Sequence, residues 1–497
     1  MHQRLRRLFI AAFAIAALAA PFDAAIAATA GSRVAAADLA RVAAATAVGQ
    51  GLAVTEVELP ATSETLALDV ERFEVFAPDA EIVVHGASGT RTLPAPANAY
   101  FRGTVAGEEG SRVFLEVLAN GETRGVITRA GDAAFLLDSA EPDGTDARGR
   151  LQALRADASQ LKAGSEPWQC AQGDLPAQPQ TIAGWDVIAA ATPEGGAAAE
   201  TDAETPQALP LYTARVAIET DFEFYAKFNN ATTATNYVGN LIGYASTIYA
   251  TEISTSLVVQ SVSLWATASD PWTQTSTLCG LMEFGRYWNK NKTGTSRTIA
   301  HFMSGKSLGG GIAWLGVLCS NGFNTSASCP GIPTDAAWGG GYGFTASLSG
   351  TFDINNPTVM WDIMSVSHEI GHNFNSPHTH CYAGIGGSSS PIDQCYGTES
   401  GCYAGARILP GPAGAGSGTI MSYCHLVRSS YTDVSLNFGT GHPYGVQPGR
   451  EAARMKSFVT SVAGGNPSCL APAPASTAIF ANGFESGVAA WTGGKKP

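Results

Sequence analysis

The sequence predicts a mixed α/β (α+β) domain over residues 210–470, preceded by a mostly β domain over residues 28–188. The second part shows a strand, a helix and a strand in succession, the order typical of a parallel sheet. The first part contains short β-prone runs separated by turn residues. Residues 189–209 have few large apolar side chains and are typical of a linker between the two. A chain of 497 residues is long enough to bury a core in each part.

The N-terminus, residues 1–27, has the pattern of a secretory signal peptide. Arg4, Arg6 and Arg7 precede an apolar run of 13 residues, Leu8 to Ala20, and small residues follow it. That run is too short for a transmembrane helix, so we expect a secreted, extracellular protein without an integral membrane segment after signal removal. The formal net charge of −13 disfavours nucleic acid as a partner.

Within the first domain, residues 66–70 and 112–117 are examples of the β-prone runs, and Asn120-Gly121 is a turn signal. In the second domain, residues 214–218 predict a strand. Apolar side chains recur at helical spacing over residues 222–250. These elements, with a further strand at 256–265, predict a βαβ unit.

The cysteines favour an oxidising compartment. Eight of the nine lie between Cys279 and Cys469, which predicts up to four disulfides whose connectivity the sequence leaves open. Cys170 stands alone. The acidic residues Asp353 and Asp362, with Asp393 further on, are too scattered to identify a calcium loop, so the sequence leaves calcium binding open.

Residues 368–378, HEIGHNFNSPH, have the spacing of a zinc site on one helix and the turn after it. His368 and His372 are one helical turn apart and point the same way, so both can bind one metal ion. His378 is expected to return as the third ligand, and Glu369 can reach a water at the metal. Three protein ligands leave a fourth position open, which is the catalytic arrangement rather than the structural one.

The helix that carries this motif is expected to begin with Asn356 as N-cap and Pro357 in the first turn. Its exit needs a sharp turn, and Asn375 tolerates the left-handed backbone better than most residues do. One face is predicted to be buried, consisting of Val359, Ile363, Val366, Ile370 and Phe374.

The motif resembles the zinc helix of the metzincin metalloendopeptidases, and its wording is most similar to the adamalysin (reprolysin) branch. Two positions depart from that pattern: Asn375 replaces a glycine, and Thr379 stands where an aspartate follows the third histidine. The resemblance implies a twisted mixed sheet, one catalytic Zn²⁺, Glu369 as general base and a protein or peptide substrate. It covers residues 210–470 and, more loosely, the part before them.

A second motif, GTIMSYC, resembles the methionine turn that lies beneath the zinc in this family. It assigns Met421 to that turn; the alternative is an ordinary buried methionine. Tyr423 occupies the place of a zinc-proximal tyrosine in astacins and serralysins, where a phenol can stabilise the oxyanion. A tyrosine packed in the core is the alternative.

Residues 304–316 resemble the edge strand above the metzincin cleft. Glycines let a second backbone approach closely, and an edge strand can pair with an extended peptide. A simple glycine-rich loop is the alternative. The residues assigned to this possible substrate strand are Gly310, Gly311, Ile312, Ala313 and Trp314.

Residues 100–127 resemble the propeptide that precedes adamalysin-type proteases, which implies a zymogen. A lone thiolate in a propeptide can occupy the open zinc position, so Cys170 is a candidate latch. A disulfide to the second domain, or an incidental thiol, are the alternatives. Two other classes of protein also remain open: a zinc-containing binding or adhesion module, and a zinc hydrolase that acts on a non-peptide bond.

Overall fold

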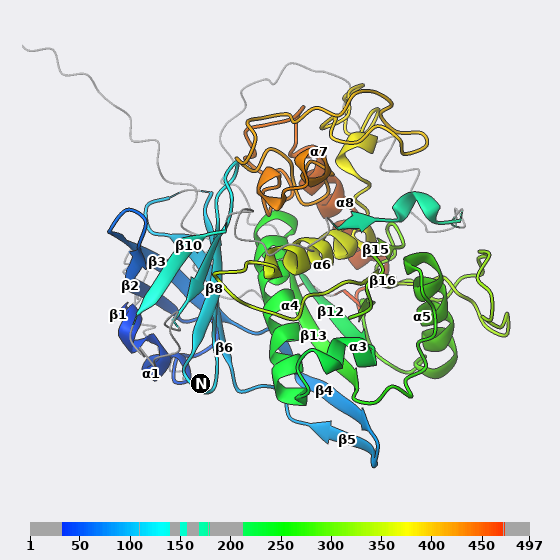
Figure 1. The fold of residues 1–497 in the computed structure, drawn as a ribbon, viewed down its shortest axis with the longest axis horizontal. Coiled ribbons are helices and arrows are strands. Elements are labelled where there is room, and N and C mark those ends of the chain that lie inside the picture. The colour runs from blue at the N-terminus through cyan, green and yellow to red at the C-terminus, as the bar shows by residue number, and fades with distance from the viewer. Residues whose placement is uncertain are drawn as a thin grey trace, which may run out of the picture.

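The computed structural model describes residues 32–108, 110–139, 150–156, 168–176, 178, 212–470 and 472. The predicted signal peptide, the linker 189–209 and all of the tail 471–497 except residue 472 lie outside the described residues. We call the described part of residues 32–156 the N-terminal unit and residues 212–470 the C-terminal unit. Each unit is built around its own sheet (Figure 1). No helix within the described residues is both long and apolar enough to cross a membrane.

The sheet of the N-terminal unit closes into a barrel, because β2 pairs with both β3 and β10. Every residue of β7 is buried, because both faces of this strand are covered. Val113 and Leu115 point into the barrel, and Phe114 points outward onto the C-terminal unit. The mostly β character of this half is therefore confirmed. The strands of this sheet are β1 (Ser32–Ala35), β2 (Gly51–Leu59), β3 (Glu64–Phe73), β6 (Ala99–Val105), β7 (Arg112–Val117), β8 (Thr123–Thr128), β9 (Phe135–Asp138) and β10 (Leu151–Arg155), and the unit also has the short helices η1 (Ala36–Asp38) and α1 (Leu39–Ala43).

The second sheet has the order β11-β15-β16-β14-β12-β13-β4-β5 and is mixed. Strands β12 and β13 run parallel, as the βαβ pattern predicts, while β15 runs antiparallel to β16. Its strands are β4 (Phe76–Gly86), β5 (Gly89–Leu93), β11 (Gln169–Cys170), β12 (Tyr212–Thr220), β13 (Thr255–Trp265), β14 (Ile299–Met303), β15 (Gly310–Ala313) and β16 (Tyr342–Thr345).

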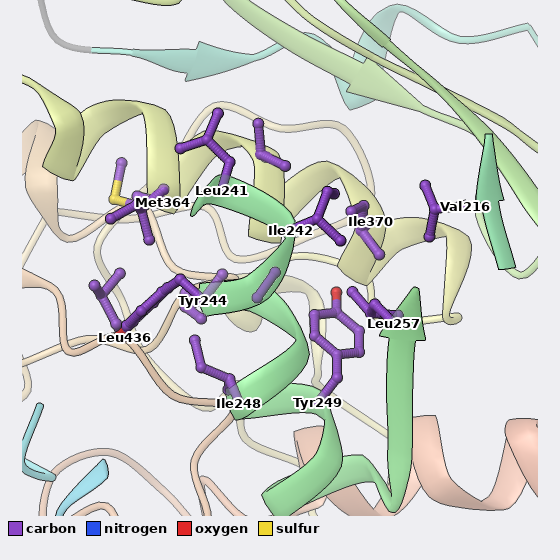
Figure 2. Close-up of a cluster of buried hydrophobic side chains, with 14 of the residues drawn as sticks. Val216, Leu241, Ile242, Tyr244, Ile248, Tyr249, Leu257, Met364, Ile370 and Leu436 are labelled. Carbon is purple, nitrogen blue, oxygen red and sulfur yellow. The ribbon is translucent and has the colours of Figure 1, made fainter. Parts of the chain in front are cut away.

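Helices cover both faces of this sheet (Figure 1). Val216 and Ile218 of β12 pack with α4 and α6, whereas Ala217 faces the cluster that contains α5. Figure 2 shows Leu241 and Ile242 of α4 meeting Ile370 of α6 in the first of these cores. The longer helices are α4 (Ala231–Ile253), α5 (Thr277–Asn291), α6 (Val359–Asn373) and α8 (Arg450–Gly465), and the shorter ones are α3 (Phe222–Ala226), α7 (His425–Arg428), η3 (Gln172–Asp174), η4 (Thr379–Cys381) and η5 (Tyr431–Asp433).

Two helix boundaries differ from the sequence prediction. The predicted helix over 222–250 is divided into α3 and α4, because Asn229 adopts a φ of 49° and Asn230 caps α4 by accepting a hydrogen bond from the Thr233 amide at 3.0 Å. Helix α6 begins at Val359 with Thr358 as its N-cap rather than Asn356. Asn356 and Pro357 lie in a tight turn ahead of it, in which the Met360 amide donates to the Pro357 carbonyl at 3.1 Å.

The β4–β5 hairpin departs from the expected division into a β domain and an α/β domain. It belongs to the N-terminal half of the chain, yet β4 pairs in parallel with β13 and extends the sheet of the C-terminal unit. Periodicity identifies such a segment as a strand but carries no information about which sheet it joins.

The prediction of four disulfides is confirmed. They join Cys279 to Cys329, Cys319 to Cys469, Cys381 to Cys402, and Cys395 to Cys424. All eight cysteines lie in the C-terminal unit, and Cys170 is free and buried. A disulfide from Cys170 to the second domain is therefore not formed.

Candidate metal centre

Helix α6 places His368 and His372 on one side, and each ring is fixed by its Nδ1–H. His368 donates to the Ile420 carbonyl at 2.8 Å, and His372 donates to the Ser376 carbonyl at 2.7 Å. Because Nδ1 carries the proton, each Nε2 atom keeps a lone pair that can bind a metal ion, and the carbonyl that accepts from Nδ1 fixes the orientation of the ring.

The chain leaves α6 through the turn that the sequence predicts at Asn375. Asn375 has a φ of 76°, in the left-handed region. Its carbonyl accepts from Arg454 Nε at 2.6 Å, and its side-chain oxygen accepts from Arg454 Nη2 at 3.0 Å. This turn directs the chain back toward α6. The ring centroid of His378 therefore lies 4.8 Å from that of His372 and 5.2 Å from that of His368.

One ligand atom from each of His368, His372, His378 and Cys170 lies within 4.8 Å of the others, and all four residues are buried. The Nε2 atoms of His368 and His378 have no hydrogen-bond partner. Buried polar atoms without partners need an explanation, and a bound cation would provide one. Burial lowers the pKa of all three imidazoles, which keeps them in the neutral form that binds metal. Nitrogen and sulfur donors in this number fit Zn²⁺.

Glu369 lies beside this cluster, beneath β15. Both of its carboxylate oxygens are buried without a hydrogen-bond partner, and burial raises its pKa well above the ordinary value. A Cβ at position 311 would lie 2.5 Å from Glu369 Oε1, so only glycine fits there. The carboxylate is thus held between the histidines and the strand.

Met421 lies against helix α6, and Tyr423 lies beside His378. Met421 is fully buried, and its Sδ would lie 2.5 Å from a Cβ placed on Gly371 in α6. The ring of Tyr423 lies 4.4 Å from that of His378, and its hydroxyl donates to the Cys170 carbonyl at 2.6 Å. Both residues therefore lie next to the histidine cluster.

The segment around Cys170 covers the cluster. Its strand β11 runs parallel to β15: the Gln169 amide donates to the Gly309 carbonyl at 3.1 Å, and the Ala171 amide donates to the Gly311 carbonyl at 2.8 Å. Cys170 Sγ lies 3.4 Å from His372 Nε2. Of the predicted strand residues, Gly310, Gly311, Ile312 and Ala313 form β15, and Trp314 follows it as a buried side chain.

Sequence reasoning did not place Glu399 or Asp393 near the centre, and it left the role of the nearby His425 open. Glu399 Oε2 accepts from His378 Nδ1 at 2.7 Å and from His380 Nε2 at 2.8 Å. Thr379 donates to Asp393 at 2.5 Å, so a carboxylate still lies beside the position where the adamalysin pattern has its aspartate. His425 donates from Nε2 to the Trp168 carbonyl at 2.8 Å. No motif marks Glu399, whose position depends on the Cys381–Cys402 disulfide close to it.

Residues 211–435 match the Reprolysin_5 family model, described as Metallo-peptidase family M12. Among solved structures, the chain is similar to metalloproteinase-II from Bacteroides fragilis, at 12% sequence identity and a TM-score of 0.35, over 70% of this chain and 89% of that one. No curated protein matches the chain. The match of residues 211–435 to this family model confirms the resemblance to the reprolysin branch and supports a zinc metalloendopeptidase.

Proposed function

We propose that the chain is a secreted zinc endopeptidase made as a latent precursor, with a metzincin fold in its catalytic domain. In this proposal residues 1–27 are the signal peptide, 28–188 the propeptide, 189–209 the linker, 210–470 the catalytic domain and 471–497 a tail. Four disulfides, which are typical of exported proteins, support secretion.

The observation that carries the proposal is the convergence of three buried, neutral histidines beside an unpartnered carboxylate. His368, His372 and His378 would hold the metal through Nε2. When bound, Zn²⁺ supplies the positive charge that polarises a peptide carbonyl and lowers the pKa of water. A structural zinc site would have no use for Glu369, whose burial without a partner is costly.

Glu369 is proposed as the general base. Its carboxylate oxygen accepts the proton of the attacking water and returns that proton to the nitrogen of the leaving amine. In the covered site, burial raises the pKa of Glu369. Uncovering the site admits solvent and so relieves this burial of the carboxyl group.

Tyr423 and β15 are proposed to hold the substrate. The Tyr423 hydroxyl already donates to a backbone carbonyl, that of Cys170, and the same donor can stabilise the oxyanion of a substrate. The Gly309 and Gly311 carbonyls already accept hydrogen bonds from an extended backbone, which is how an edge strand binds a peptide. Met421 is proposed to support α6 from below.

Cys170 is proposed as the latch of the precursor. Its thiol is the one non-histidine donor in the described cluster, and thiolate is a good zinc ligand. Without a cation, burial and the Glu369 carboxylate raise the pKa of Cys170, so its thiolate needs the charge of a metal. A latch of this kind therefore depends on the loaded centre.

The test is cleavage of an unfolded protein by processed wild type and by Glu369→Gln, with bound zinc quantified in both. We expect cleavage by the wild type alone and equal zinc in both samples. Glu223→Gln, which changes an exposed carboxylate on α3, is the matched control and should cleave normally. A cleavage rate of Glu369→Gln near that of wild type would rule out Glu369 as the general base. Zinc in both samples with no cleavage by either would favour a binding module.

A further inference from the structure

The β4–β5 hairpin completes the sheet of the C-terminal unit (Figure 1). Residues 81–85 of β4 pair with residues 261–265 of β13. The Val259 amide donates to the Val75 carbonyl at 2.7 Å, and the Ala266 amide donates to the His85 carbonyl at 2.9 Å. Without the hairpin, β13 would present an open strand edge, and such edges favour aggregation.

Aromatic side chains of the N-terminal unit rest on two glycines of α4. A Cβ at Gly243 would lie 2.6 Å from Phe114 Cε2, and a Cβ at Gly239 would lie 2.6 Å from the Tyr100 hydroxyl oxygen. Phe114 and Tyr100 belong to the same hydrophobic core as Tyr244, which packs edge-on against Phe114 at 6.3 Å. The two units therefore share one core.

Buried polar contacts also cross between the units. Arg112 of β7 forms an ion pair with Glu252 of α4 at 2.9 Å, and both side chains are at most 6% exposed. Glu252 also accepts from the amides of Phe438 and Thr440 at 3.0 and 2.9 Å. Departure of the N-terminal unit would leave this carboxylate without its cation, and breaking a buried pair in this way is strongly destabilising.

The segment over the candidate metal centre pairs with the sheet over only two residues, although Trp168 and Cys170 are buried. Residues 168–171 contribute the two-residue strand β11, the hydrogen bonds to β15, and the bonds from Tyr423 and His425. Within the described residues, no disulfide joins them or the N-terminal unit to the C-terminal unit. Trp168 and Cys170 belong to the same hydrophobic core as Phe114, but the hydrogen bonds that hold this segment go to β15, Tyr423 and His425 rather than to the barrel.

We propose that the N-terminal unit is a lasting structural subunit of the folded peptidase, and that opening the site moves residues 168–171 while the barrel and the β4–β5 hairpin stay in place. The edge of β13, and the face of α4 that carries Gly239 and Gly243, therefore fit residues 32–156 of this same chain. The inference deepens the proposed latency, but its strand pairing and shared core do not depend on peptidase activity. A single cut between the units would leave a two-chain, non-covalent protein.

The experiment uses the full chain with a recognition sequence for a site-specific protease inserted between Gly195 and Gly196. After complete cutting, we expect both fragments to elute together at the mass of the intact chain in size-exclusion chromatography, also in 1 M NaCl and after a roughly 100-fold dilution. Separation into an N-terminal fragment and a C-terminal fragment that keeps its native circular dichroism would overturn the proposal. This readout is independent of proteolysis, so it stands whether or not the protein cleaves peptides.

A pair of glycine variants makes the test specific. Alanine is the better helix former, so Gly243→Ala favours α4 itself while its methyl group displaces Phe114. We expect the cut fragments of Gly243→Ala to separate at a lower urea concentration than those of the parent. Gly464→Ala, at a helical glycine of α8 with nothing within 4 Å, should match the parent. Equal shifts for both variants would count against the shared core.

A second measurement covers the case in which Gly243→Ala does not fold. Hydrogen exchange at the Val259 and Ala266 amides of the cut parent protein, which donate to the Val75 and His85 carbonyls, reports directly on this pairing. Protection equal to that in the uncut chain supports the retained subunit. Exchange at least 100-fold faster at these amides, with β12 still protected, would show that the hairpin leaves and would overturn the proposal.

Discussion

Removing the Glu399 carboxylate is expected to weaken zinc binding without changing any metal ligand. Glu399 Oε2 holds His378 Nδ1 at 2.7 Å and His380 Nε2 at 2.8 Å. Burial alone would raise the pKa of Glu399, but the hydrogen bonds from these two histidines help to lower it below its ordinary value. The group is therefore a carboxylate that fixes the orientation and tautomer of His378, the proposed third ligand.

The expected magnitude follows from the two bonds. Glu399→Gln keeps an acceptor oxygen but loses the charge, and charge-assisted hydrogen bonds are roughly twice as strong as neutral ones. We expect a loss of about 1 kcal/mol, or roughly fivefold in the zinc dissociation constant. Glu399→Ala leaves His378 Nδ1 without its acceptor, and loss of such partners costs about 10–100-fold in metal affinity.

The assay is zinc competition against a chromophoric chelator, in a Cys170→Ser background so that three histidines alone bind. Glu283→Ala is the matched control, because Glu283 accepts hydrogen bonds from the amide and hydroxyl of Thr273 and is not hydrogen-bonded to a histidine of the cluster. Unchanged zinc affinity in Glu399→Ala would refute the positioning role. Equal losses in Glu399→Ala and Glu283→Ala would instead indicate a general effect on folding.

Three further predictions concern the cover, the oxyanion and the buried contact between the units. The Cys170→Ser precursor should cleave peptides before processing; a precursor as silent as wild type would exclude the latch. Tyr423→Phe should lower turnover about 100-fold with zinc retained, as measured by kinetics and metal analysis; unchanged kinetics would return Tyr423 to a packing role. Glu116 of β7 accepts a hydrogen bond from Asn240 of α4 at 3.2 Å, across the contact between the units. Burial raises the pKa of Glu116 to about 7, so relative to Glu116→Gln the wild type should lose up to about 3 kcal/mol of stability between pH 4.5 and 7. Urea unfolding at pH 4.5 and 8 checks this; the same difference between the two proteins at both pH values would contradict it.

The sequence predicted the parts of the fold that local periodicity determines. The strand–helix–strand order gave the parallel pair β12 and β13, and the turn at Asn375 has the left-handed backbone expected of it. The β4–β5 hairpin was beyond such reasoning, since its partner β13 lies more than 170 residues further along the chain. Pairing over that distance depends on the assembled core of α4 and the barrel rather than on any local pattern.

The candidate site divides in the same way. The three histidines and Glu369 follow from spacing on one helix and one turn, so the sequence could place them together. Glu399 and Asp393 come from irregular chain after the helix, where Cys381–Cys402 and Cys395–Cys424 decide the path. Because eight cysteines allow 105 pairings, the sequence could not bring these carboxylates to the centre.

The glycine run before Trp314 links the cover, the strand and the base. Gly309 has a φ of 83°, which few other residues adopt. A side chain on Gly310 would collide with the backbone of Gln169, and one on Gly311 would collide with the Glu369 carboxylate. The sequence predicted close approach of a second backbone at this strand, and the structure places such a backbone there. Since Gly311 also contacts the proposed base, a peptide paired along β15 would lie directly over Glu369, where the covering segment now lies.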